Sequence, residues 1–286
     1  MKHRACLVAL LLLAACSVPG RSDIVIGSKD FTEQVVLSEL LAQHIESTGV
    51  RVGRRFYLRG TYIAHQALLA GRIDLYVEYT GTALTAVLRE PVVNDARAAY
   101  DRVRNGYATR FNLEVGPPLG FQNTFAIIIR GEDARRLNIR SLSEAARHTL
   151  GWRAGFGYEF MERPDGFPGL ARAYGLQFGA PPRIMDLGLL YRALQEKQVD
   201  LVAGNSTDGA ITALDLFVLA DDRRYFPPYE AVPIVRRQTL EKYPAVRAAI
   251  AQLAGKLTAD EMRRMNYAVD GQHRDVADVV REFLRR

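Results

Sequence analysis

The sequence predicts an α/β fold built from two similar lobes. Short apolar strands alternate with helical patterns: "IVIG" is followed by apolar residues at helical spacing, namely Val36, Leu37, Leu40, Leu41 and Ile45. Such alternation is typical of mainly parallel sheets covered by helices. The length of 286 residues exceeds the usual size of one domain, so one large or two ordinary domains are expected.

The N-terminus is predicted to be a secretory signal peptide spanning residues 1–15. A basic "MKHR" precedes the apolar "ACLVALLLLAA", which is too short to span a bilayer as a helix. Leu13-Ala14-Ala15-Cys16 resembles the bacterial lipobox, in which cleavage precedes a lipid-bearing cysteine. We therefore expect a lipid anchor on Cys16 and a location in the periplasm or at the cell surface; ordinary cleavage with Cys16 incidental is the alternative.

The first strand–turn–helix unit places a lysine in a position that favours anion binding. Asp30 and Glu33, three residues apart, resemble a capping box for the following helix. Lys29 lies in the turn before that helix, where an ammonium opposes the helix dipole unless an anion also sits there. This position favours a carboxylate site, with a merely exposed lysine as the alternative.

One internal repeat supports the two-lobe prediction. "ALLAGRIDLYVEYTGT" from Ala67 aligns without a gap with "ALQEKQVDLVAGNSTD" from Ala193, and "NTFAIIIRGED" resembles "YEAVPIVRRQT" more loosely. The chain is expected to cross between lobes near 123–130 and 229–236. Tyr79 aligns with Asn205, and since open α/β sheets bind ligands at the carboxyl ends of their strands, both should face a shared cleft. Generic likeness of two helix–strand units is the alternative explanation.

The C-terminal segment is predicted to form two helices. Thr258 is the expected N-cap of the first, and Gly271 is expected to end it. The second carries an apolar stripe at helical spacing, made of Val276, Val279, Val280 and Phe283.

Composition and motifs argue against several functions. The formal net charge is +6, but the basic residues are scattered, which does not indicate nucleic-acid binding. The five histidines lack metal-ligand spacing. Walker A and GxSxG motifs are absent, and "GFGYEF" lacks the third glycine of a dinucleotide fingerprint. Ser206 has no base near it in the sequence and is expected to cap a helix. The sequence thus predicts no enzyme, no metal and no cofactor.

The remaining polar and aromatic residues suggest a zwitterion site. Arg163 lies in the Pro/Gly-rich loop "ERPDGFPG", and a guanidinium forks well onto a carboxylate. Thr82 could donate a hydroxyl. Tyr79, Phe125 and Tyr229 begin or end predicted strands, and such rings can cage a quaternary ammonium, although each alone is more often part of a core than of a cage.

These segments together resemble the binding proteins of ABC importers for glycine betaine, choline, carnitine and related osmoprotectants. The resemblance covers nearly all of the chain beyond the signal peptide and rests on "IGSKDFTEQ", "GRIDLYVEYTGTAL", "PLGFQNTFAIIIR", "EFMERPDGFPGL", "NSTDGAI", "LADDRRYFPPYEAVPIVR" and "MNYAVDGQ". It implies a type II periplasmic-binding-protein clamshell with two crossover segments. Residues 24–122 and 226–286 would form domain I, and 123–225 domain II.

The resemblance also implies roles for individual residues. Tyr79, Phe125 and Tyr229 would line the aromatic cage, whereas Lys29, Thr82 and Arg163 would hold a carboxylate, and Asn123 would add a backbone carbonyl. Two positions depart from the family pattern, because Asn205 and Phe125 stand where the family has an aromatic residue and a tyrosine. A bulkier betaine or another amino-acid-like solute therefore competes with glycine betaine as the expected ligand.

The expected partners are a small zwitterionic or cationic solute, an ABC permease with its ATPase, and the membrane through the lipid. A monomer that binds no nucleic acid is expected. A sensory solute-binding domain that reports to a membrane receptor, and an exported enzyme on the same scaffold, are the alternatives.

Overall fold

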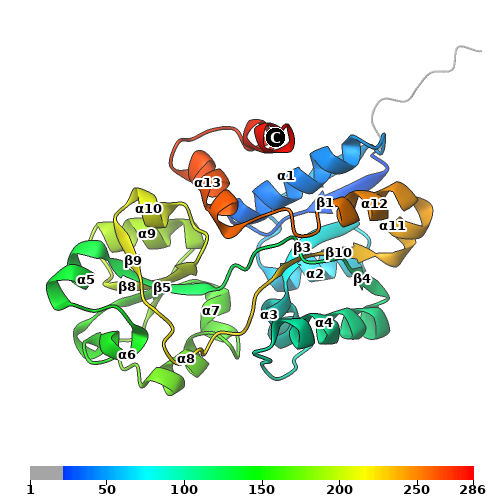
Figure 1. Cartoon of the computed structure of the whole chain (residues 1–286). Coiled ribbons are helices and arrows are strands. Elements are labelled where there is room, and N and C mark those ends of the chain that lie inside the picture. Colours follow the sequence, from blue (N-terminus) through cyan, green and yellow to red (C-terminus); the bar gives the residue numbers. More distant parts are fainter. Residues whose placement is uncertain (1–21) are drawn as a thin grey trace, which may run out of the picture.

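The computed structural model describes residues 22–286, which form two lobes, each built on a five-stranded sheet (Figure 1). The predicted signal peptide and Cys16 lie outside the described residues. No helix within residues 22–286 is long and apolar enough to cross a membrane.

Lobe I contains the sheet with strand order β2-β1-β3-β10-β4. β1 runs parallel to β2 and β3, whereas β10 runs antiparallel to β3 and β4. Its strands are β1 (Ile24–Gly27), β2 (Val52–Arg55), β3 (Leu75–Tyr79), β4 (Leu113–Val115) and β10 (Ala231–Arg236). Its helices are α1 (Thr32–Glu46), α2 (Thr61–Leu69), α3 (Thr80–Thr82), the π-helix η1 (Ala83–Val87), α4 (Ala96–Phe111), α11 (Arg237–Lys242), α12 (Pro244–Gln252), α13 (Ala259–Asp270) and α14 (Val276–Leu284).

Lobe II contains the sheet with strand order β7-β6-β8-β5-β9. Its strands are β5 (Phe125–Arg130), β6 (Ala154–Phe156), β7 (Arg183–Ile184), β8 (Leu201–Asn205) and β9 (Leu216–Val218). Its helices are α5 (Gly131–Leu137), α6 (Leu142–Ala145), the 3₁₀ helix η2 (Thr149–Gly151), α7 (Tyr158–Glu162), α8 (Phe167–Tyr174), α9 (Leu187–Gln195) and α10 (Ala210–Ala213).

The internal repeat is confirmed, because the two sheets have the same topology. β3 pairs with β10 so that Tyr79 faces Ala231, and β8 pairs with β5 so that Asn205 faces Phe125. The aligned strands thus occupy equivalent places in the two lobes. Each of these two residue pairs contains one aromatic ring. In lobe I the ring is Tyr79 on β3, whereas in lobe II it is Phe125 on β5, the antiparallel neighbour of β8.

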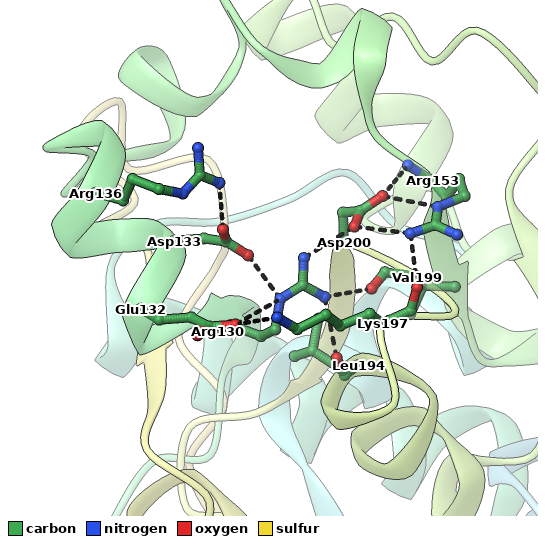
Figure 2. Close-up of polar contacts among 9 residues, drawn as sticks. All are labelled: Arg130, Glu132, Asp133, Arg136, Arg153, Leu194, Lys197, Val199 and Asp200. Atoms are coloured by element: carbon green, nitrogen blue, oxygen red, sulfur yellow. Dashed lines mark hydrogen bonds and ion pairs between the residues drawn. The ribbon is translucent and has the colours of Figure 1, made fainter.

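Asp74 and Asp200, which the repeat aligns, stabilise one end of each sheet. Tyr79 and Asn205 lie at the opposite ends of the strands that follow these aspartates. Asp74 accepts the backbone N–H of Val25, and Asp200 accepts that of Arg153. Asp200 also binds the guanidinium groups of Arg130 and Arg153, within the ion-pair cluster of lobe II (Figure 2). This cluster ties β5, β6 and β8 together, and its members are Arg130, Glu132, Asp133, Arg136, Arg153, Lys197 and Asp200.

The chain crosses between the lobes twice, and the two crossings lie side by side. Gln122 and Glu230 form an antiparallel bridge, and the N–H of Asn123 donates to the carbonyl of Tyr229 at 3.0 Å. The strands of each sheet come from one of the two predicted domains. The predicted two-lobed α/β fold is therefore confirmed, while the boundaries at 122–123 and 225–226 stay a prediction.

The ends of two helices test the local predictions. The capping box of Asp30 and Glu33 is wrong: α1 follows Phe31, which makes no side-chain cap, and Glu33 is buried inside the molecule. Distant partners outcompete the local backbone for this carboxylate. At the other end of the chain, Thr258 caps α13 in a capping box, and Gly271 follows its last turn. In α14, Val279 and Val280 are buried as the apolar stripe predicts.

Candidate functional site

A cavity of about 330 Å³ lies between the lobes, at the lower end of small-molecule pockets. It opens where β1, β3, β6 and β8 end, which is where open α/β sheets bind ligands. All eight predicted site residues line it: Lys29, Tyr79, Thr82, Asn123, Phe125, Arg163, Asn205 and Tyr229. Their role as ligand contacts stays a prediction.

Glu33 holds two of these residues from behind. The Tyr79 hydroxyl donates to Glu33 Oε1 at 2.6 Å, and the Asn123 amide donates to the same oxygen at 2.8 Å. Burial and the charge of Glu33 raise the pKa of Tyr79 well above its usual value, so it remains a neutral phenol donor. Its ring is thereby fixed at the end of β3.

The same carboxylate connects the lobes. Glu33 Oε2 accepts from the Thr207 hydroxyl of lobe II and, at 3.2 Å, from the Asn266 amide of α13. Burial raises the pKa of Glu33, and these four donors oppose that rise. α13 contacts α1 of lobe I and α10 of lobe II and lies between the two lobes (Figure 1). Glu33 is therefore a junction between α1, the crossings and lobe II.

Lys29 has its anion already, and that anion belongs to the protein. Its Nζ lies 2.6 Å from Glu78 Oε1 and 3.3 Å from the Thr61 hydroxyl, and both charged side chains are almost fully buried. The prediction that Lys29 requires an external anion is therefore wrong, since Glu78 supplies the negative charge. Lys29 Nζ also lies 4.9 Å from the Tyr79 ring centroid.

Arg163 is likewise paired within the wall. Its Nε and Nη2 donate to the two oxygens of Asp165 at 2.9 and 2.5 Å, and its Nη1 donates to Thr82 Oγ1 at 3.0 Å. Burial alone would raise the pKa of Asp165, but the Arg163 guanidinium holds it below its usual range. The Tyr229 hydroxyl donates to Asp165 at 2.6 Å. One carboxylate thus orients a cation and a ring of the cavity.

The rings of Phe125 and Tyr229 meet edge to face, with centroids 5.8 Å apart and planes at 77°. The Arg163 guanidinium carbon lies 4.8 Å from the Phe125 centroid. Gly81 explains part of the "TGT" sequence, because a Cβ there would lie 2.6 Å from the Tyr229 ring. The absence of a side chain lets this ring seat against α3.

Asn205 is held by a fourth carboxylate. Its backbone N–H donates to Asp208 Oδ2 at 2.9 Å, and its Nδ2 lies 3.3 Å from both oxygens of Asp208. The Tyr191 hydroxyl of α9 donates to Asp208 as well. Burial raises the pKa of Asp208 to about 6, against these hydrogen bonds. Asp208 is therefore mainly ionised at neutral pH and acts as an acceptor.

Sequence reasoning missed several parts of the site. Phe31 lines the cavity and stacks near Tyr79, with centroids 6.5 Å apart. Glu159 and Phe160 enter from α7. The sequence contained a signal for these residues. Phe31 ends the pattern "SKDF" in the turn after β1, and Glu159 and Phe160 follow β6, which occupies the place of β1 in the other lobe. The expected capping by Ser206 is wrong, because its hydroxyl accepts from the N–H of Thr124 and faces Asn123.

The cavity offers positioned rings, the guanidinium groups of Arg59 and Arg163, and hydroxyls. In residues 22–286 no group of histidine, cysteine, aspartate and glutamate side chains could hold a metal ion. The arrangement suits capture of a small polar molecule with an apolar or cationic part.

Comparisons with known proteins agree with this geometry. A family model described as the substrate binding domain of ABC-type glycine betaine transport systems matches residues 22–286. A carnitine transport binding protein of Listeria monocytogenes is 34% identical over 290 residues, covering 98% of this chain and 93% of that protein. An ergothioneine transport permease/ergothioneine binding protein of Helicobacter pylori is 33% identical over 264 residues, covering 92% of this chain but 47% of that protein. A crystal structure described as a glycine betaine/carnitine/choline ABC transporter superposes with a TM-score of 0.76 at 33% identity, covering 92% and 97% of the two chains.

Proposed function

The chain belongs to the family of substrate-binding domains of ABC-type glycine betaine transport systems, and it is not an enzyme; from this premise we propose that its cavity holds a zwitterionic quaternary ammonium solute. The observation that carries this proposal is the convergence of ring faces, a guanidinium and a hydroxyl on one cavity of about 330 Å³. The predicted ligand contacts listed above are its residue-level content.

The cationic end of the solute is assigned to the rings. Tyr79, Phe125 and Tyr229 line the cavity, and Phe31 adds a fourth ring beside Tyr79. A quaternary ammonium carries no N–H, so it loses fewer hydrogen bonds on leaving water than a primary ammonium does. Each such contact is worth roughly 0.5–2 kcal/mol when desolvated.

The carboxylate end is assigned to Arg163 and Thr82. Thr82 Oγ1 accepts from Arg163, which leaves its own hydroxyl hydrogen available to a ligand. The pairs Lys29–Glu78 and Arg163–Asp165 are each neutral overall. These two pairs add no net charge to the wall, which suits a solute whose own charges sum to zero.

The transport cycle follows from the two lobes. The solute binds between them, the lobes close around it, and the closed form delivers it to the permease. We propose that the protein works as a monomer outside the cytoplasm, tethered by lipid on Cys16. We propose that domain I (24–122, 226–286) and domain II (123–225) are the two parts that move relative to each other, with the paired crossings between them.

The identity of the solute is narrowed by Asn205. Relatives carry the names of carnitine, ergothioneine and glycine betaine, and all three compounds are trimethylammonium carboxylates. The amide at 205 is smaller than a ring and polar, which favours a betaine larger than glycine betaine.

Calorimetry of the purified protein tests this function. We expect trimethylammonium carboxylates to bind and glycine, which lacks the methyl groups, not to bind. Arg163→Ala should weaken carboxylate ligands more than choline; equal losses would assign Arg163 a structural role. If no quaternary ammonium compound bound, the proposed function would be wrong.

A further inference from the structure

The amide of Asn205 is a polar group that lines the cavity. It sits at the end of β8, directly across from Phe125 on β5. The equivalent position in lobe I is Tyr79, which carries a ring. The two lobes thus present unlike groups to the cavity at equivalent strand ends.

Asp208 decides which end of this amide faces the cavity. Both carboxylate oxygens lie 3.3 Å from the Asn205 side chain, and one also accepts the Asn205 backbone N–H. A carboxylate only accepts hydrogen bonds, so the NH₂ group must turn toward it. A reversed amide would place its carbonyl oxygen against two negatively charged oxygens.

The carbonyl oxygen of Asn205 is therefore the end left for a ligand. Within the part of the chain that the structure describes, Oδ1 accepts no hydrogen bond, whereas Nδ2 is engaged by Asp208. The residue is half-buried and lines the cavity. A closed cavity would remove Oδ1 from water, and a desolvated acceptor without a donor costs free energy.

We infer that Asn205, oriented by Asp208, selects betaines whose body carries an N–H or O–H donor over betaines that lack one. This inference rests on the proposed function, because it describes how the same cavity distinguishes among its solutes. Discrimination by a buried hydrogen-bonding group is strong, since the analogue without the donor leaves Oδ1 unpaired.

Two matched ligand pairs test the inference by calorimetry on the full protein. The first pair is L-carnitine and its 3-deoxy analogue, 4-trimethylammoniobutyrate. The second is histidine betaine and phenylalanine betaine, which differ in the ring N–H. In each pair the trimethylammonium and carboxylate groups are unchanged. We expect the donor-bearing member of at least one pair to bind at least tenfold more tightly.

Two variants locate the effect. Asn205→Leu should abolish the preference, so that the two members of each pair bind with Kd values within threefold of each other. Asp208→Asn should weaken or invert it, because the new amide can donate to Asn205 Oδ1 and turn Nδ2 toward the ligand. Tyr191→Phe is the matched control: it removes another donor to Asp208 but leaves the Asn205 contact, so the preference should remain.

The outcomes separate this inference from the proposed function. If the wild-type protein bound both members of both pairs within threefold, the inference would be overturned and the function would stand. A preference that survived in Asn205→Leu would also overturn it, and this variant decides the question if Asp208→Asn fails to fold. If no betaine bound at all, the function itself would fail, and the inference with it.

Discussion

The carboxylate of Glu159 in lobe II lies 2.5 Å from the backbone nitrogen of Thr61 in lobe I. Helix α2 has no side-chain cap of its own, since Gly60 occupies its N-cap. One lobe therefore caps a helix of the other, and the contact exists only while the lobes are together.

Glu159→Gln should favour the open form of the protein. A carboxylate at a helix N-terminus contributes about 1 kcal/mol, and its loss should lower the ratio of closed to open molecules about fivefold. Gly60→Ala should do the same, because the new Cβ would lie 2.2 Å from Glu159 Oε1. Energy transfer between one dye on each lobe measures the change. Glu162→Gln, an exposed neighbour on α7, is the control, and equal opening in all three variants would refute the cap.

Tyr229 should matter to the ligand through its ring more than through its hydroxyl. Tyr229→Ala removes a ring face and should weaken betaine binding more than tenfold, about 1.4 kcal/mol. Tyr229→Phe loses only the hydrogen bond to Asp165 and should change the Kd less than threefold while lowering stability by about 1–2 kcal/mol. Calorimetry and urea unfolding separate the two effects. A large loss of affinity in the Phe variant would show that the hydroxyl, not the ring, is essential.

His65 should make the protein less stable in mild acid. It is buried against Tyr107 and Phe111, both ring nitrogens lack a partner among the described residues, and burial lowers its pKa to about 4. Between pH 4 and 6.5 the unfolded chain binds a proton that the folded chain does not, so this residue makes stability rise with pH.

Replacing His65 tests that sign. His65→Leu should reduce the rise in stability between pH 4 and 6.5, and should stabilise the protein by about 1 kcal/mol at pH 7 because two unpaired polar atoms are removed. Urea unfolding at several pH values gives both numbers. The control His44→Leu changes a more exposed histidine and should leave the slope in place. An unchanged slope in His65→Leu would assign it to other groups.

Asp200 should stabilise lobe II without affecting the ligand. Burial alone would raise the pKa of Asp200, but hydrogen bonds from Arg153 and Arg130 lower it to about 2. Its contribution is therefore present above pH 3.8 and is lost as the pH falls through 2. Asp200→Asn should cost about 1–2 kcal/mol at neutral pH and leave the Kd unchanged, since Asn205 lies at the other end of β8. Glu196→Gln, which breaks an exposed helical pair, should have no measurable effect. A changed Kd in Asp200→Asn would contradict this separation.

The sequence carried enough information to predict the lobes and the side chains that face the cavity. Strand ends are local features, and the repeat placed Tyr79 and Asn205 at equivalent ends. The groups behind the wall were not predictable in this way. Glu33 and Thr207 are 174 positions apart in the chain, and no local pattern links them. The predicted capping box of Asp30 and Glu33 is wrong for the same reason. The Glu33 carboxylate binds the distant Thr207 hydroxyl instead of a nearby backbone N–H.

A common principle connects the missed residues. Glu33, Glu78, Asp165 and Asp208 each fix one or more cavity side chains from the protein side. The sequence predicted that Lys29 and Arg163 hold the charge of a ligand. In the structure, Glu78 and Asp165 neutralise these two cations. The cavity therefore presents oriented donors, acceptors and ring faces to a ligand.

The order of strands along the chain also sets an order of completion during synthesis. All five strands of lobe II lie between residues 125 and 218, but lobe I lacks its strand β10 until residues 231–236 are made. β4 joins its sheet through β10 alone, and β10 sits beside β3 in the middle of that sheet. In a chain that emerges amino end first, the inserted lobe can fold while the outer lobe is still unfinished. The cavity requires both lobes, so it can form only after strand β10 has completed the sheet of lobe I.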